Sequence, residues 1–241
     1  MRFFTKEWYN DTLIADMCFQ LRKNESASVF SERFFERLYA VEERAYIKYY
    51  KRNAKATRTN FSKDDAAREF ASNYKENLEF VKANLPEDIL ADVKDIRVLA
   101  LGTATHDIAM RITRFCGKKN RLCENAERNY NNASEEADER VGGAVVRRLL
   151  SLIGAQIRSL DAADDGDVSL TFASVETGKS EKLILKDAVL TESDGDVSGS
   201  VIVKYELLTT EDEGFEFSLL LLSDSSSLLT VTYKAASIET E

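Results

Sequence analysis

The stretch RVGGA, residues 140–144, separates two parts of the chain whose sequence patterns differ. Only two of the ten glycines, Gly102 and Gly117, precede it. Apolar residues recur every three to four positions before this stretch and every second position after it, which indicates helices followed by strands. The sequence therefore predicts an α+β protein, with a mainly helical domain at 1–141 and an acidic antiparallel β domain at 142–241.

The helical part carries several start signals. Thr5 is placed to cap a first helix, and Phe4 and Tyr9 occupy the positions of a hydrophobic staple across that cap. Later helices are expected to begin near Ser28 or Ser31, at Ser62, after Pro86 and at Thr105. The last of them ends in a polar tail, residues 124–140, which we expect to fray.

Alternation dominates the second part. In VSLTFASV, residues 168–175, Val168, Leu170 and Phe172 share one face, and similar runs follow near residues 201, 215 and 229. Asp165-Gly166 and Asp194-Gly195 lie between such runs and are typical of hairpin turns, because glycine readily adopts positive φ. We expect about six strands in an antiparallel meander. The segment 144–160 is compatible with either a helix or the start of a strand.

Composition excludes several classes of protein. Three cysteines, an odd and low count, favour a reducing compartment over secretion. No apolar run approaches the roughly 18 residues that a membrane span needs. Residues 5–7 interrupt the opening apolar stretch too early for a secretory signal. The expected location is therefore the cytoplasm, with no contact to a membrane.

Negative charge is concentrated near the end of the chain. Residues 161–241 carry 18 acidic and 5 basic side chains, and much of the excess lies in expected turns. Such a surface steers a basic protein partner electrostatically, or it is a general acidic surface with no partner. The candidate partner-binding residues are Asp164, Asp165, Asp167, Glu211, Asp212 and Glu213.

The most basic stretch lies in the expected helix around residues 44–58. Lys48, Lys51, Arg52 and Lys55 follow helical spacing, with tyrosines between them. Lysines in this arrangement could lie along a phosphate backbone while tyrosines stack on bases. The same pattern describes the solvated face of an ordinary helix. Because residues 1–160 carry only a small positive excess, binding of nucleic acid is not expected to be the main role.

No motif assigns a catalytic reaction. His106 is the single histidine, so catalysis by a Ser/His or Cys/His pair and a His-rich zinc site lack support. Cys116 and Cys123 lie seven residues apart, which is not a zinc spacing, and both are expected to be buried. A calcium loop starting at Asp161 would need a glutamate at residue 172, where Phe172 stands. We therefore predict no catalytic, cofactor or metal residue and leave enzymatic activity open.

Two stretches carry a resemblance to a known family. FFTKEWY at residues 3–9 and LPEDILADVKDIRVLALG at 85–102 resemble the bacterial family catalogued as Domain of Unknown Function 4085. The resemblance implies a bacterial cytoplasmic protein with an acidic, strand-rich second half. It carries no catalytic residue over to this chain, because the family has no established activity.

Three hypotheses on function remain. The first is a non-enzymatic interaction protein that uses its acidic β domain. The alternative is an enzyme or a small-ligand-binding module with a pocket between the two halves. A weaker alternative is RNA binding through the basic helix 44–58.

Overall fold

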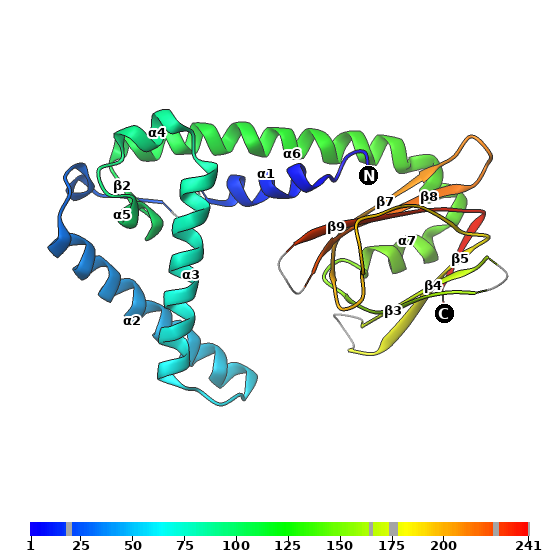
Figure 1. The fold of residues 1–241 in the computed structure, drawn as a ribbon, viewed down its shortest axis with the longest axis horizontal. Helices are drawn as coiled ribbons and strands as arrows, with labels where there is room; N and C mark the ends of the chain where they lie inside the picture. Colours follow the sequence, from blue (N-terminus) through cyan, green and yellow to red (C-terminus); the bar gives the residue numbers. More distant parts are fainter. Residues whose placement is uncertain (18–20, 164–165, 174–177, 224–226, 241) are drawn as a thin grey trace. The chain divides into compact units, whose positions relative to one another are not determined.

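The structure, a computed structural model, combines helices with an antiparallel sheet and confirms the α+β class (Figure 1). Two compact units divide the chain. The helical unit comprises residues 13–120, and the sheet unit comprises residues 1–12 and 121–241. The residues that the structure describes are 1–17, 21–163, 166–173, 178–223 and 227–240.

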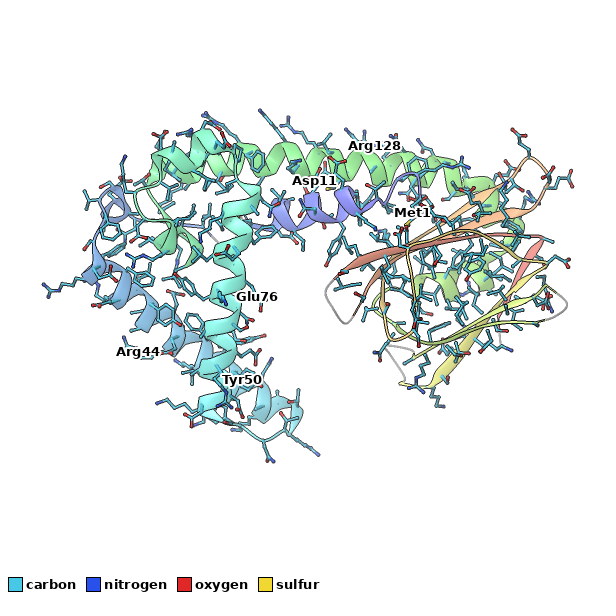
Figure 2. All side chains as sticks on the ribbon, in the orientation of Figure 1. Met1, Asp11, Arg44, Tyr50, Glu76 and Arg128 are labelled. Carbon is cyan, nitrogen blue, oxygen red and sulfur yellow. The ribbon has the colours of Figure 1, made fainter. Side chains whose placement is uncertain are left out.

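Two long helices dominate the helical unit. α2 (Glu32–Thr57) packs against α3 (Lys63–Asn84), and Figure 2 shows Arg44 and Tyr50 on α2 and Glu76 on α3. The predicted caps are confirmed, because the hydroxyls of Ser31 and Ser62 accept hydrogen bonds from backbone N–H groups three residues on, at 3.3 and 3.2 Å. These bonds satisfy donors that a helix start otherwise leaves free.

Further elements complete the helical unit, among them the first part of α6, whose second part belongs to the sheet unit. Its core gathers apolar side chains from α1, α3, α4, α5 and α6, including the fully buried Ile112 and Cys116. A two-stranded parallel sheet joins β1 to β2. The bounds of these elements are α1 Lys6–Met17, β1 Arg22–Lys23, η2 Glu25–Ser28, α4 Glu87–Asp92, α5 Ile96–Ala100, β2 Thr103–Ala104 and α6 His106–Val141.

Arg97 anchors α5 within the helical unit. Its guanidinium pairs with the buried carboxylate of Asp95 at 2.8 Å and with Glu32 at 2.9 Å. The same group lies 4.3 Å from the ring centroid of Phe35, a cation–π contact. Because hydrogen bonds to two carboxylates favour the charged form, the pKa of Arg97 is raised.

In the described residues, the sheet unit contains eight strands, the short helix α7, the start of α1 and the second part of α6. The strand order is β10-β5-β4-β3-β7-β8-β9-β6, and all neighbours are antiparallel. The bounds are α7 Gly143–Leu150, β3 Gln156–Ala162, β4 Val168–Ala173, β5 Ser180–Lys186, β6 Val189–Ser193, β7 Val201–Thr209, β8 Phe215–Leu222, β9 Leu228–Ala235 and β10 Ser237–Thr240.

Consecutive pairing holds within two groups of strands. β3, β4 and β5 form one meander and β7, β8 and β9 form another, while β7 pairs with β3 and β6 pairs with β9. Asp194-Gly195 therefore does not turn between paired strands as expected, because β6 and β7 are not neighbours. The Asp165 position of the other expected turn lies outside the described residues, and the adjoining Gly166 has a φ of +89°.

The sheet closes on itself. Lys186 of β5 pairs with Ser237 of β10, and Val189 of β6 pairs with Lys234 of β9. The β6–β9 ladder therefore continues the β5–β10 ladder without a shift in register at their junction. At their junction the Ala236 N–H donates to the Lys186 carbonyl at 2.9 Å. β5–β6 and β9–β10 thus behave as two bent strands. When each is counted as one strand, the sheet has the six strands that the sequence predicts.

The end of α6 differs from the expected frayed tail. The helix continues to Val141, and Tyr130, Ser134 and Ala137 are buried. Ala137 and the α7 residue Leu149 join the apolar core of the sheet. The chain consequently passes from one compact unit to the other twice, at 12/13 and at 120/121. The sequence predicts a single boundary at 141/142 instead.

Candidate functional site

The opening aromatic residues are held on the sheet unit by one buried carboxylate. Glu206 of β7 is 1% exposed and accepts hydrogen bonds from the backbone N–H groups of Arg2, Phe3 and Phe4, at 2.7, 2.7 and 2.6 Å. Phe4 is also 1% exposed, and its ring makes edge contacts with Trp8 and Tyr130, each with centroids 4.8 Å apart. The backbone amides thus supply the compensation that a buried charge requires.

A cavity of about 340 Å³ adjoins this segment and lies wholly within the sheet unit. We call it the α6–β7 cavity, because α6 lines it with Tyr130, Ser134 and Asp138 and β7 lines it with Lys204 and Tyr205. Its volume falls at the lower end of the range for small-molecule sites, which is about 300–1,000 Å³.

The polar residues of α6 share one face because they are four residues apart. The Ser134 hydroxyl lies 3.3 Å from a carboxylate oxygen of Asp138 and donates to it. The Tyr130 hydroxyl oxygen accepts a hydrogen bond from the Leu207 N–H at 3.2 Å. This helix face therefore reaches the edge of β7 and places a carboxylate and two hydroxyls around the cavity.

Apolar side chains line the rest of the cavity. Val146, Leu150 and Ile153 come from α7 and the turn that follows it, and Phe4 comes from the opening segment. Leu150 is 56% exposed and Ile153 is 39% exposed, so apolar surface lies open at the rim. A cavity lined by both apolar and polar side chains is suited to an amphipathic ligand.

Burial governs the protonation of the polar side chains that line the cavity. It raises the pKa of Asp138 above the ordinary value of 3.8, and the Ser134 hydrogen bond offsets only part of the change. Burial likewise raises the pKa of Tyr130 to about 12. Burial also raises the pKa of Tyr205, and electrostatic repulsion from Tyr130 and Asp138 raises it further. Among the described residues, no cationic side chain forms an ion pair with Asp138.

Lys204 is occupied by other partners. Its ammonium nitrogen lies 4.8 Å from the ring centroid of Phe4, 5.6 Å from that of Trp8 and 3.7 Å from a carboxylate oxygen of Glu127. These contacts combine cation–π attraction with an ion pair. The positive charge in the cavity wall is therefore balanced locally by Glu127.

The predicted acidic residues fall at two different ends of the sheet. Gln156 of β3 pairs with Val201 of β7 in antiparallel fashion, so the two strands run from this point in opposite directions. The turn after β3 contains Asp167, and the turn after β7 contains residues 211–213. Asp164 and Asp165 lie outside the described residues. The structure therefore does not bring the two predicted groups together.

The two groups also differ in their ion pairing. A carboxylate oxygen of Asp167 lies 2.6 Å from the Lys186 ammonium, and this pair lowers the pKa of Asp167. Glu211, Asp212 and Glu213 are exposed, and within the described part of the chain their carboxylates form no ion pair. Among the described members of the two groups, Glu211, Asp212 and Glu213 therefore present carboxylates without an ion pair.

The predicted basic residues Lys48, Lys51, Arg52 and Lys55 lie exposed along the second half of α2. Most of the interleaved rings are not available to bases. The Tyr46 hydroxyl donates to Glu69 at 2.7 Å, and the Tyr50 ring contacts Tyr46 and Phe61. Tyr49 alone among these tyrosines is largely exposed, at 61%. This arrangement resembles the solvated face of a packed helix.

The remaining candidate residues occupy structural positions. His106 is exposed at the first turn of α6, and Cys116 and Cys123 are buried free thiols, as expected. Cys18 lies outside the described residues. In the described ranges, no group of three or more His, Cys, Asp and Glu side chains could hold a metal ion, and no helix is long and apolar enough to cross a membrane.

Comparison with known proteins adds no relative. No family model matches the chain, and neither does any curated protein or any solved structure. The resemblance to Domain of Unknown Function 4085 therefore stays a prediction.

Sequence reasoning missed the residues of the α6–β7 cavity. Tyr130, Ser134 and Asp138 were included in a tail expected to fray, although their i, i+4, i+8 spacing marks one helix face. Lys204 and Tyr205 stand next to each other in a strand, so one of them was expected to face solvent. No local motif links the helix to the strand, because the cavity exists only once both elements pack.

Proposed function

We propose that this protein is a small-ligand-binding module whose site is the α6–β7 cavity. The observation that carries this proposal is the Asp138 carboxylate, half-buried in an apolar-walled cavity with no ion-pair partner among the described residues. The raised pKa of Asp138 means that the folded chain disfavours its charge. A side chain that costs stability in a cavity is typical of a binding site, since selection for stability alone would remove it.

Two matched variants test whether the cavity binds ligands. Leu150→Trp places an indole at the rim of the cavity, and Leu122→Trp makes the same change at a leucine of equal exposure that does not line it (56% and 55%). The measurement is a fragment screen on the isotope-labelled full chain by NMR. We expect binding to the parent and to Leu122→Trp, with signals of cavity residues shifting, and loss of binding in Leu150→Trp.

The proposal is wrong under either of two results. One is that no fragment binds the parent chain at millimolar concentration. The other is that Leu150→Trp binds the same fragments with the same affinity and the same shifted signals.

A second candidate function is electrostatic recognition of a basic protein partner. The turn containing Glu211, Asp212 and Glu213 supports it, because these carboxylates are exposed and form no ion pair in the described part of the chain. Neutralising all three should lower the association rate with a basic partner and make that rate less dependent on salt concentration. Asp167→Asn is the control, because the Asp167 charge is already paired with Lys186. Equal rates for the triple variant and the parent would refute this role.

A further inference from the structure

The α6–β7 cavity contains polar groups whose hydrogen-bonding capacity is not used. The Asp138 carboxylate accepts one long hydrogen bond, from Ser134 at 3.3 Å, although a carboxylate has about four acceptor positions. Tyr205 is 6% exposed and lines the same cavity, and within the described residues its hydroxyl has no hydrogen-bond partner. Both groups therefore keep acceptor positions that are open to a donor on a ligand in the cavity.

The charges around the cavity do not balance. Glu127 and Lys204 form a pair at 3.7 Å, and Lys204 is further held over the rings of Phe4 and Trp8. Asp138 is the remaining charge, and it has no ion-pair partner among the described side chains. A ligand that restores the balance carries one positive charge.

The walls restrict the rest of the ligand. Val146, Leu150 and Ile153 add apolar surface to the lining, which also includes the ring of Tyr130. An aromatic face attracts a cation more strongly than it attracts a neutral group. A cation attached to a compact apolar body fits this distribution better than a hydrated metal ion does.

We propose that the α6–β7 cavity binds a small organic amine in its ammonium form, which pairs with the Asp138 carboxylate and donates to the Tyr205 hydroxyl while its apolar body packs against Val146, Leu150 and Ile153. This inference rests on the proposed function, because it names the class of ligand for that same cavity.

Three probes that share a phenyl ring and differ in their polar group test the charge. They are 2-phenylethylammonium, 2-phenylethanol and 3-phenylpropionate, titrated into the full chain at pH 7.5 by calorimetry. We expect the amine to bind at least about tenfold more tightly than the alcohol, which is the effect of one charge-assisted contact. We expect the anionic probe to bind weakest, because it meets an uncompensated carboxylate.

Variants assign the preference to particular atoms. Asp138→Asn keeps the shape and removes the charge, so it should erase the preference for the amine over the alcohol. Tyr205→Phe keeps the ring and removes the hydroxyl, so it should weaken the amine several-fold. Asp212→Asn removes a charge outside the cavity and should leave the preference unchanged.

The outcomes distinguish a failure of the amine class from a failure of the proposed ligand site. If the alcohol or the propionate binds as tightly as the amine, or if Asp138→Asn keeps the preference, the amine class is wrong and the cavity remains a ligand site. If none of the three probes binds while other fragments do, the amine class is again wrong. If no fragment binds the parent chain at all, the proposed function itself fails.

Discussion

The clamp that Glu206 forms on the opening segment allows a quantitative test. Its two oxygens accept three backbone hydrogen bonds of 2.6–2.7 Å, and the side chain is 1% exposed. In Glu206→Gln the amide oxygen can still accept from Phe3 and Phe4. The amide nitrogen then faces the Arg2 N–H, so two donors oppose each other in a partly buried position.

The expected cost follows from these contacts. Leaving one buried donor unsatisfied costs about 1–3 kcal/mol, and two further bonds each lose about 1 kcal/mol of charge assistance. We expect Glu206→Gln to lower the free energy of unfolding by about 3 kcal/mol. Glu206→Ala removes all three acceptors, so the segment should undock and expose Phe4, whose burial contributes about 2 kcal/mol.

Tryptophan fluorescence and urea denaturation separate the two effects. Trp8 is the single tryptophan, and its ring contacts Phe4, so undocking should shift its emission to the red. Glu216→Gln is the matched control, since in the described residues the ion-pair partner of Glu216 is the exposed guanidinium of Arg2, at 3.3 Å, and the variant should cost less than about 1 kcal/mol. Equal stabilities for the two glutamine variants, with unchanged emission in Glu206→Ala, would refute the clamp.

Three further predictions concern charged residues elsewhere. Because burial raises the folded pKa of Asp138, its charge destabilises the fold above pH 3.8. Asp138→Asn should therefore be more stable than the parent at pH 7 by calorimetry, and the difference should close as the pH falls toward 3.8. Asp194 has its pKa lowered to about 2, so Asp194→Asn should cost about 1 kcal/mol at pH 7 in urea denaturation, a difference that disappears as the pH falls from 3.8 to about 2. Arg97→Gln leaves the buried Asp95 carboxylate without its ion-pair partner and should cost about 3 kcal/mol. Arg111→Gln frees exposed carboxylates and should lower the melting temperature much less, and similar melting temperatures for the two variants would contradict this reasoning.

Local chemistry made the helix starts predictable. Ser31, Ser62 and Thr105 each accept a hydrogen bond from a backbone N–H three residues later, as the sequence indicated. Thr5 does the same for α1, but Phe4 packs against Trp8 and Tyr130 instead of the expected Tyr9. The cap depends on neighbours in sequence, while the partner of Phe4 depends on where distant elements pack.

Strand alternation was less reliable on β7. Val201, Val203, Tyr205 and Leu207 were expected to share the buried face, yet Val201 is exposed and Ile202 is fully buried. A register shift between Ile202 and Lys204 changes which side chains face the core. The irregularity arises from pairing with β8, so the sequence of β7 alone does not reveal it.

The sequence by itself determined the α+β class, the helix caps, the period of the strands and the uneven charge, because each depends on the spacing of residues along the chain. Only the tertiary structure decided that β5–β6 closes the sheet against β9–β10, that Glu206 holds the opening segment, and that α6 and β7 enclose a carboxylate. These features join residues far apart in sequence. Their energies come from burial and from hydrogen bonds that exist only when the distant partners meet.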